Sequence, residues 1–191
     1  MAVVESQMVP LGAPAPDFEL DDVSSKQRVS RRDFTGKPLL VVFMSNHCPY
    51  ARHVEAKLAE VANAYSGRGV ATVWISSNDV ENYPADAPEN LAEQARRVGA
   101  NFPYLYDASQ EVAKAYKAMC TPDLYLFDAE HKLFYRGRFD ATRPEKGEPT
   151  GEDLVAALEA LLAGEQPPEP QWPSMGCNIK WKPGNEPEYF G

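Results

Sequence analysis

The stretch Val42-Phe-Met-Ser-Asn-His-Cys-Pro-Tyr50 joins the two strongest secondary-structure signals in the chain. It begins inside residues 38–44, a continuous apolar run rich in β-forming residues, which is typical of a strand covered on both faces. After it, apolar residues recur at the spacing of one helix face, at Val54, Leu58, Val61, Ala62 and Tyr65. The stretch therefore predicts a buried strand, a short loop that carries Cys48, and an amphipathic helix.

The rest of the chain continues this alternation of strands and helices. A second buried run covers residues 70–75, and a short helix is predicted at residues 91–98. Residues 123–127 and 133–139 predict a hairpin around a polar turn, and Thr150-Gly-Glu-Asp153 is a capping-box signature for the last helix. Buried parallel strands joined by crossover helices, with one antiparallel hairpin, predict an α/β fold of three layers, α/β/α.

The two ends of the chain differ from its middle. Residues 1–12 are predicted to be a tail, and residues 13–163 a single domain. Residues 164–191 are rich in proline but also contain large apolar residues, which disordered tails usually lack, at Trp172, Ile179, Trp181 and Phe190. We therefore expect residues 164–191 to be an extension that packs on the domain.

Composition excludes several classes of protein. The chain has 191 residues, 43% hydrophobic and 25% charged, which fits one globular domain. Its net charge of −9 argues against binding to nucleic acid or to an anionic membrane, because both need a basic face. No signal-peptide pattern or membrane-length apolar run is evident. The three cysteines are too few for a disulfide scaffold, so we expect a cytoplasmic protein.

Cys48 is the cysteine whose surroundings favour reactivity. At the start of a helix, unpaired amide groups and the helix dipole stabilise negative charge, and so the nucleophilic thiolate. Pro49 suits a first helical turn, since proline has no N–H group to lose. His47, Arg52 and His53 place further positive charge within one turn, and His47 is also a candidate general acid or base. The alternative interpretation of Cys48 is a small buried side chain at a helix start.

Several motifs resemble those of one known family. Asn-His-Cys-Pro-Tyr at residues 46–50 is similar to a thioredoxin-fold active site, and Ala-Pro-Asp-Phe-Glu-Leu at residues 15–20 resembles the peroxiredoxin-like branch, the AhpC/TSA or redoxin family. One subgroup of it combines the first motif with those at residues 77–84, 120–123 and 176–181, the last being Gly-Cys-Asn-Ile-Lys-Trp. The resemblance covers essentially the whole chain. It implies a thioredoxin-like fold with an N-terminal extension, an insertion before residues 120–123 and a wrapped C-terminal segment.

The resemblance also implies roles for individual residues. Thr121 and Pro122 match the loop that faces the active cysteine, in which a cis peptide bond precedes the proline and exposed backbone pairs with a thiol substrate. Ser45, three residues before Cys48, matches the peroxiredoxin hydroxyl that contacts the thiolate or a bound peroxide. Arg136 and Arg138 share one face of the second hairpin strand, and either is a candidate for the arginine that holds the peroxiredoxin cysteine as a thiolate; the alternative is an exposed sheet face.

Two departures from the family patterns bear on mechanism. Ala51 stands where thioredoxins carry the second cysteine of Cys-x-x-Cys, and Ser45 stands where many members of the subgroup carry a cysteine. No local dithiol therefore remains around Cys48. Val41 stands where peroxiredoxins have a proline, so the peroxiredoxin motif is half matched.

The histidines have alternative interpretations. His47 and His53 together with Cys48 are candidate metal ligands, but copper-binding members of the superfamily use Cys-x-x-x-Cys, and this chain lacks that spacing. We therefore expect no metal and no cofactor. His131, in the predicted hairpin turn, is expected on the surface.

The leading hypothesis is a peroxiredoxin-like thiol oxidoreductase with antioxidant activity, in which Cys48 attacks a peroxide or a disulfide. Either Cys177 or Cys120 is a candidate to resolve the oxidised cysteine, and the sequence does not decide between them. The alternatives are a monothiol disulfide reductase or isomerase, and a non-catalytic redox-sensing or partner-binding module. The expected partner is a thiol reductant of the thioredoxin, glutaredoxin or glutathione type, and the aromatic C-terminal segment permits a homodimer.

Overall fold

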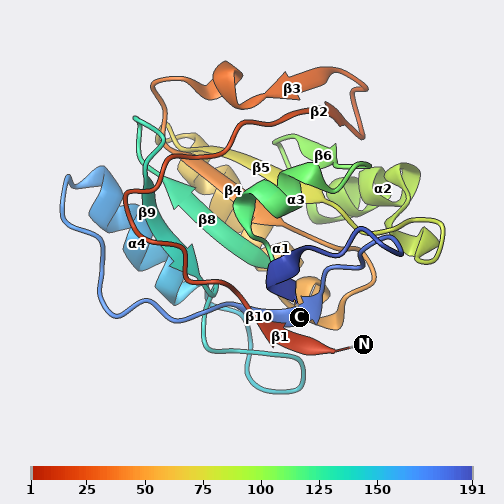
Figure 1. Ribbon diagram of the computed structural model, residues 1–191. Coiled ribbons are helices and arrows are strands. Elements are labelled where there is room, and N and C mark those ends of the chain that lie inside the picture. The colour runs from red at the N-terminus through yellow and green to blue at the C-terminus, as the bar shows by residue number, and fades with distance from the viewer. Residues whose placement is uncertain (1, 191) are drawn as a thin grey trace.

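The computed structural model describes residues 2–190 and centres on a seven-stranded mixed sheet of order β3-β2-β6-β5-β4-β8-β9 (Figure 1). The three central strands β4, β5 and β6 are parallel, and the strands on either side of them are antiparallel. The strands of this sheet are β2 (Glu19–Asp22), β3 (Arg28–Ser30), β4 (Leu39–Phe43), β5 (Ala71–Ser76), β6 (Tyr104–Tyr106), β8 (Asp123–Phe127) and β9 (Leu133–Gly137).

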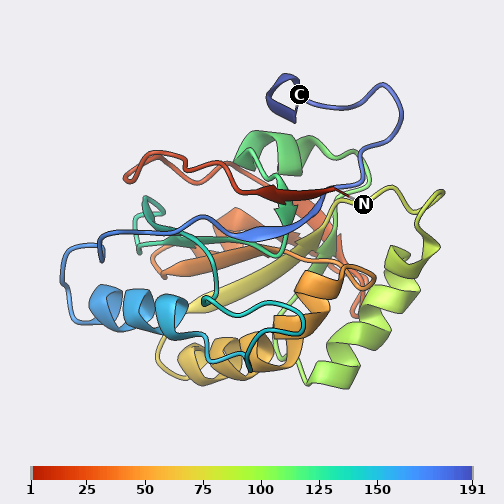
Figure 2. The same ribbon diagram turned by 90° about the horizontal axis from the view of Figure 1, so that it is seen from below.

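Helices cover both faces of the sheet, which confirms the predicted α/β/α architecture. Three helices pack on one face, whereas α3 and two segments from the ends of the chain, within residues 9–18 and 179–190, cover the other (Figure 2). The helices are α1 (Pro49–Ser66), α2 (Pro88–Val98), α3 (Glu111–Tyr116) and α4 (Glu152–Leu162), with short 3₁₀ helices η1 (Arg31–Phe34), η2 (Pro84–Asp86) and η3 (Glu188–Phe190). None of the helices described between residues 2 and 190 is both long and apolar enough to cross a membrane.

Strand β4 shows why the apolar run before Cys48 folds as it does. Successive side chains of a strand point to opposite faces of the sheet, and both faces are covered here. Leu40 and Val42 pack into the core beneath α1, whereas Leu39, Val41 and Phe43 pack into the core on the side of α3. All five side chains are buried, so the run is apolar at every position.

The second sheet joins the two ends of the chain to the loop at residues 120–123. It has three antiparallel strands in the order β1-β10-β7: β1 is Val3–Glu5, β10 is Met175–Asn178 and β7 is Cys120–Thr121. Residues 1–12 were expected to form a tail, but β1 pairs with β10 because each strand supplies the backbone hydrogen bonds that the other lacks. Ile179 and Trp181, which follow β10, are buried.

Two local expectations are wrong. The last helix begins after Gly151, which has a positive φ and no capping side chain, and the Asp140 carboxylate instead accepts the amide hydrogens of Thr150 (2.8 Å) and Gly151 (2.7 Å). His131 is buried rather than on the surface, because its Nε2 contacts the carbonyls of Phe34 and Lys37, both at 3.1 Å.

Candidate active site around Cys48

Cys48 caps the N-terminus of α1, and Pro49 occupies the first helical position. The Cys48 side chain is buried, with 0% of its surface exposed. The Ser45 hydroxyl accepts the Cys48 amide hydrogen at 3.1 Å, which fixes the turn between β4 and α1. The Cys48 thiol, when protonated, donates to the carbonyl oxygen of Thr121 at 3.1 Å. The helix start and the loop before Pro122 therefore meet at the Cys48 sulfur.

Thr121 and Pro122 lie where the resemblance to the family implies. The peptide bond between them is cis. Thr121 is buried in β7, and the Pro122 carbonyl accepts a hydrogen bond from the Ser174 hydroxyl at 2.5 Å. This bond ties the loop to the segment that leads into β10.

Cys177 is the cysteine that the fold brings to Cys48. It lies in β10 directly across from Thr121, whose carbonyl oxygen is 3.1 Å from the Cys48 sulfur, and each of the two cysteines shifts the pKa of the other. Gly176 permits this approach, because a Cβ atom there would lie 2.0 Å from the Thr121 carbonyl oxygen. The glycine of the Gly-Cys-Asn-Ile-Lys-Trp motif thus lets β10 approach the backbone of Thr121, beside Cys48.

The two thiols of this pair have different acidities. The Cys177 hydrogen bond lowers the pKa of Cys48 to about 6 against the opposing effect of burial, and the Thr121 side chain and the Ala51 backbone add to the lowering. The same bond to Cys48, together with burial, raises the pKa of Cys177. Cys48 is therefore the thiolate at neutral pH, and Cys177 is the thiol that donates to it.

Cys120 has different surroundings. It is fully buried, burial raises its pKa well above the ordinary value, and its sulfur lies 3.5 Å from the Pro122 carbonyl oxygen. A buried thiol with a raised pKa is a poor nucleophile. These surroundings favour a packing role for Cys120.

Asp86, at the end of η2, organises the loop before Cys48. One of its carboxylate oxygens accepts the amide hydrogens of Asn46 (2.8 Å) and His47 (3.1 Å), and the other accepts from the Ser45 hydroxyl (2.8 Å) and the Asn78 amide (2.5 Å). Burial acts to raise the pKa of Asp86, but hydrogen bonds from His47 and Asn78 outweigh it and hold the pKa below the ordinary value. A buried carboxylate therefore stays charged there.

His47 is oriented by this carboxylate. Its Nδ1 lies 3.1 Å from Asp86 Oδ1, and its ring stacks on Tyr83 with centroids 5.2 Å apart. Its Nε2 is buried without a hydrogen-bond partner among the described residues. An Asp–His pair with one free ring nitrogen has the form of a general acid or base.

Lys180 places a cation in the same region. Only 5% of its surface is exposed, and its ammonium group donates to the carbonyl oxygen (2.7 Å) and the side-chain oxygen (3.0 Å) of Asn178. Its ammonium nitrogen lies 5.7 Å from the centre of the Tyr83 ring, and no carboxylate among residues 2–190 forms an ion pair with it. Burial lowers the pKa of Lys180, while the charges of Cys177, Cys48 and Asp86 oppose that lowering.

The residues predicted to tune the thiolate lie elsewhere. Arg52 is exposed on α1. His53 faces away from Cys48, with its Nε2 3.0 Å from the Thr142 hydroxyl, and Arg136 is bound to the Val9 carbonyl (2.7 Å) and the Gln171 side chain (2.7 Å). The prediction that these three residues surround the sulfur is not supported by the contacts, because β9 directs Arg136 toward residues outside the site.

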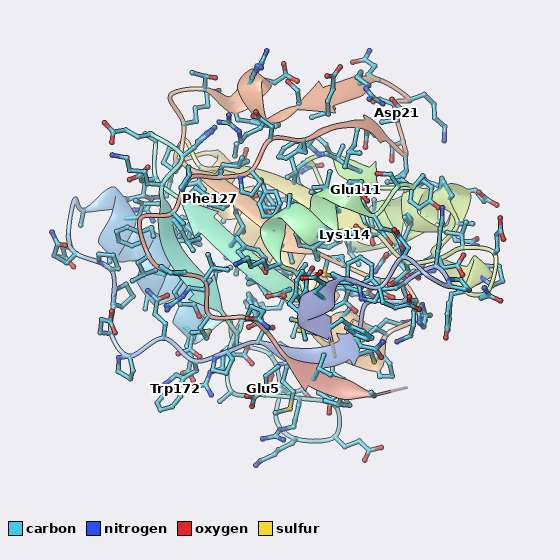
Figure 3. The ribbon with its side chains drawn as sticks, in the orientation of Figure 1. Glu5, Asp21, Glu111, Lys114, Phe127 and Trp172 are labelled. Atoms are coloured by element: carbon cyan, nitrogen blue, oxygen red, sulfur yellow. The ribbon has the colours of Figure 1, made fainter. Side chains whose placement is uncertain are left out.

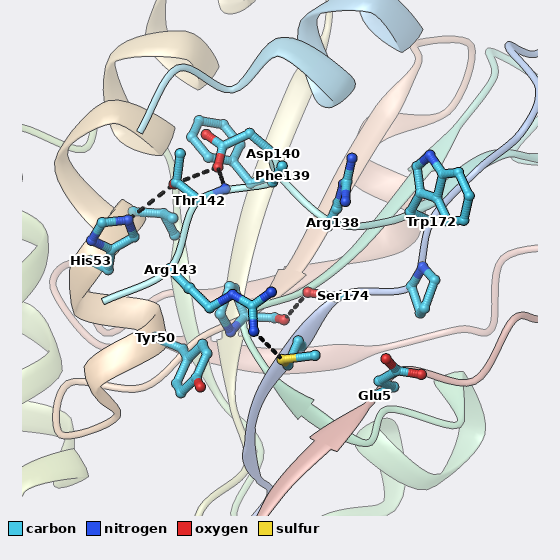
Figure 4. Close-up of a pocket in the computed structure, with 15 residues that line it drawn as sticks. Glu5, Tyr50, His53, Arg138, Phe139, Asp140, Thr142, Arg143, Trp172 and Ser174 are labelled. Atoms are coloured by element: carbon cyan, nitrogen blue, oxygen red, sulfur yellow. Dashed lines mark hydrogen bonds between the residues drawn. The ribbon is translucent and has the colours of Figure 1, made fainter. Parts of the chain in front are cut away.

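A pocket of about 420 Å³ opens beside Pro122 (Figure 4). Tyr50 and His53 of α1 form one wall, the segment after β9 forms another, and Trp172 and Glu5 lie across from them. Within residues 2–190 no group of three or more His, Cys, Asp or Glu side chains is arranged to hold a metal ion.

Sequence reasoning missed Asp86 and Lys180. Asp86 lies in a polar stretch with several other acidic residues, and nothing in the pattern distinguishes it. Lys180 belongs to the Gly-Cys-Asn-Ile-Lys-Trp motif at residues 176–181. Lys180 lies between Ile179 and Trp181, and a lysine between two large apolar residues could have indicated a buried cation.

Comparison with known proteins adds the following findings. The model of the AhpC/TSA family matches residues 11–136. The thiol-disulfide oxidoreductase ResA of Geobacillus thermodenitrificans is 24% identical over 157 residues, which cover 82% of this chain and 81% of that protein. The crystal structure of an uncharacterized conserved protein from Geobacillus kaustophilus has 50% identity and a TM-score of 0.93, covering 96% of this chain and 98% of that one.

A third comparison corrects the predicted location. The structure of a secreted Mycobacterium tuberculosis disulfide oxidoreductase shares the fold, with a TM-score of 0.60 and 18% identity over 75% of this chain and 96% of that one. The prediction of a cytoplasmic location is wrong on these comparisons. It rested on the small number of cysteines, and free thiols that take part in a redox cycle also occur in oxidising compartments.

Proposed function

The chain belongs to the AhpC/TSA family, and from this premise we propose that it is a thiol-disulfide oxidoreductase in which Cys48 attacks a disulfide and Cys177 resolves the product. One observation carries the proposal: β10 places Cys177 across from Thr121, whose carbonyl oxygen lies 3.1 Å from the Cys48 sulfur at the N-terminus of α1. Cys177 takes the place of the second cysteine that the Cys-x-x-Cys motif would supply at Ala51.

The reaction follows from the acidities of the two thiols. The Cys48 thiolate attacks one sulfur of a disulfide, forms a mixed disulfide and releases the other sulfur as a thiolate. Cys177 then loses its proton to the released thiolate and attacks the Cys48 sulfur. The second substrate thiolate leaves and takes up a proton, and a Cys48–Cys177 disulfide remains. One disulfide is reduced, two thiols are oxidised, and an external thiol reductant restores the enzyme.

The relatives support this proposal over peroxide reduction. ResA carries the description thiol-disulfide oxidoreductase. Peroxide reduction with antioxidant activity is the weaker proposal, because the Ser45 hydroxyl donates to Asp86 and accepts from the Cys48 amide. The hydroxyl is thus committed to the loop, and Arg136 is bound elsewhere.

Cys48 has no exposed surface, so a substrate reaches it only when the covering segment opens. In this proposal, the backbone of Thr121 and Pro122 forms hydrogen bonds with the substrate beside the Cys48 sulfur. His47, held by Asp86, is proposed to donate a proton to the leaving thiolate.

The test uses the fully reduced protein and one equivalent of hydroxyethyl disulfide, followed by acid quenching, alkylation and peptide mapping by mass spectrometry. We expect a Cys48–Cys177 disulfide in the wild type, and in Cys177→Ser a mixed disulfide that stalls on Cys48. Cys120→Ser is the matched control and should behave as the wild type.

Two results would overturn the proposal. In the first, Cys48→Ser consumes the disulfide as fast as the wild type. In the second, Cys177→Ser releases both substrate thiols as the wild type does. A parallel reaction with one equivalent of hydrogen peroxide decides between the two activities, since faster oxidation of Cys48 by peroxide than by the disulfide would favour the peroxidase.

A further inference from the structure

The pocket beside Pro122 is lined by several residues that the chemistry at Cys48 does not use. Tyr50 comes from the first turn of α1, Arg143 from the segment between β9 and α4, and Trp172 from the segment before β10. Glu5 at the end of β1 completes the rim. Figure 3 places Trp172 and Glu5 along one edge of the molecule, and Figure 4 shows Arg143 between Tyr50 and Glu5.

Two of the charged groups in the pocket are already bound within the protein. Asp140 accepts four hydrogen bonds, from Thr142 (2.8 Å and 2.5 Å), Thr150 (2.8 Å) and Gly151 (2.7 Å). Arg138 donates to Asp153 at 2.6 Å. These groups shape the pocket and leave little capacity for a ligand.

Two charged groups remain available. Arg143 is exposed, and its guanidinium contacts only the Met175 sulfur, at 3.9 Å, among the residues that the structure describes. Glu5 is exposed and forms no ion pair with another described residue. Arg143 contacts the Met175 sulfur, and Glu5 pairs with the same Met175 across the sheet, so a cation and an anion without ion-pair partners among the described residues lie at one part of the rim. Together they complement a ligand that carries both charges.

The pocket also offers aromatic surface. Trp172 is 51% exposed, which is unusual for so large an apolar side chain, and the Arg138 guanidinium lies 5.8 Å from its ring. Tyr50 lines the opposite wall and is half-buried. A volume of about 420 Å³ lies in the range of small-molecule sites, which is roughly 300–1,000 Å³.

The pocket adjoins the reacting sulfur. Tyr50 lies two residues after Cys48, and Pro122 directly follows Thr121, whose carbonyl is 3.1 Å from the Cys48 sulfur. A ligand seated against Tyr50 and Pro122 therefore lies beside the segment that covers Cys48, and its other end reaches the sulfur when that segment opens.

We propose that this pocket recognises the substrate, a low-mass disulfide derived from an amino acid or short peptide that carries a free carboxylate and a free ammonium group. Arg143 binds the carboxylate, Glu5 binds the ammonium group, and the disulfide lies toward Cys48. This inference rests on the proposed function and names its substrate class.

The chemical step is the exchange described above with the substituents specified. The Cys48 thiolate attacks one sulfur of R–S–S–R, where R holds both charged groups, and one R–S⁻ leaves. Cys177 then displaces the second R–S⁻, each leaving thiolate takes up a proton, and two R–SH are released.

Four disulfides of different charge test the proposal. They are glutathione disulfide with both charges, dithiodiglycolate with carboxylates only, cystamine with ammonium groups only, and neutral hydroxyethyl disulfide. The measurement is the second-order rate constant for oxidation of the reduced, full-length protein. We expect glutathione disulfide to react about fivefold or more faster than hydroxyethyl disulfide, the size of effect that accessible ion pairs give.

Variants separate the two charges. Arg143→Gln should lose about fivefold with glutathione disulfide and dithiodiglycolate, and change little with cystamine and hydroxyethyl disulfide. Glu5→Gln should lose a similar factor with glutathione disulfide and cystamine. Arg96→Gln, which removes an exposed arginine of α2 paired with Glu93, is the matched control and should leave all four rates unchanged.

Equal effects of Arg143→Gln on all four disulfides, or no effect on any, would overturn the proposal. Preferential reduction of insulin, a protein disulfide, at a rate independent of Arg143 would also overturn it. Binding of glutathione disulfide to Cys48→Ser, followed by calorimetry and by Trp172 fluorescence, is a readout independent of turnover. If only the proposed function fails, glutathione disulfide still binds to Cys48→Ser, and Arg143→Gln still abolishes this binding. If the pocket assignment fails, glutathione disulfide does not bind, or it binds equally well to both proteins.

Discussion

Lys180 is a buried cation, and the negative charge that complements it is that of the Cys48 thiolate. A buried ammonium group without a carboxylate partner is costly, and Lys180 bonds only to Asn178 oxygens and faces the Tyr83 ring. The sulfurs of Cys48 and Cys177 act on it electrostatically, so Lys180 must act on them in return. Its charge therefore favours the Cys48 thiolate.

Replacing Lys180 by methionine should raise the pKa of Cys48 from about 6 toward its ordinary value, by about 1, since one nearby opposite charge has that effect. The pH dependence of thiolate absorbance near 240 nm, or of alkylation by iodoacetamide, measures it. Other groups that face this region, Cys177, Asp86 and Tyr83, are unchanged in the variant.

Lys182→Met is the matched control for this experiment, because Lys182 lies in the same segment and donates to the Ala108 carbonyl (2.6 Å) instead. Its Cys48 pKa should equal that of the wild type. An unchanged Cys48 pKa in Lys180→Met, or an equal rise in both variants, would refute this electrostatic role.

Single residues were predictable where the backbone alone determines their surroundings. Cys48 follows a buried strand and precedes a helix, and those two patterns are enough to place it at a helix N-terminus. Cys177 was a candidate, but its choice over Cys120 depends on the register of β10 against β7. Asp86 and Lys180 act through contacts between segments that no local pattern encodes.

At the scale of elements, η2 and the start of α1 are joined by one carboxylate. Asp86 accepts the amide hydrogens of Asn46 and His47 and the hydroxyl hydrogen of Ser45. Capping boxes and helix propensities could not reveal this arrangement, because the acceptor lies about 40 residues from its donors. The last helix shows the same effect, since Asp140 serves its N-terminus in place of the predicted capping box.

Asp86→Asn should destabilise the fold by about 2 kcal/mol at pH 7. The variant loses hydrogen bonds to a charged group, and its side-chain NH₂ group, itself a donor, faces groups that donate to Asp86 in the wild type. The pKa of Asp86 lies below its ordinary 3.8, so its stabilisation is present above about pH 4 and is lost as the pH falls through the folded-state value. The difference between variant and wild type should therefore shrink in acid.

Urea unfolding at pH 7 and at pH 3 measures this difference. Glu81→Gln, which alters an exposed carboxylate in the same loop, is the control and should change stability little at either pH. A destabilisation by Asp86→Asn that stays constant down to pH 3 would contradict a charged Asp86.

At the scale of the whole molecule, the ends of the chain cover the active site. The seven-stranded sheet and its helices follow from hydrophobic periodicity, which is why the α/β/α architecture could be predicted. The three-stranded sheet could not, because β1 is too short to carry a pattern and its partner β10 lies some 170 residues away. The same sheet holds Cys177 on Cys48 and keeps Cys48 from solvent.

Strand β10 is held on both edges, and β1 supplies one of them. The Ser6 amide donates to the Ser174 carbonyl (2.9 Å), the Ser174 amide donates to the Ser6 hydroxyl (2.9 Å), and the Asn178 amide donates to the Ala2 carbonyl (3.0 Å). Without these bonds, β10 keeps only its short pairing with β7. Local opening costs less free energy when fewer backbone bonds must break.

Deletion of residues 2–6 should therefore expose Cys48 more often and raise its rate of alkylation by iodoacetamide at pH 8 by about tenfold, which corresponds to one or two lost hydrogen bonds. At that pH the thiolate of wild-type Cys48 is already formed, so a faster reaction in the deletion variant reports access and not a lower pKa. Mass spectrometry assigns the label, and Cys120 in the same protein is the internal control, because it lies in the core and should stay unlabelled. Equal labelling of Cys120 would indicate global unfolding, and an unchanged rate at Cys48 would mean that β1 does not hold the cover in place.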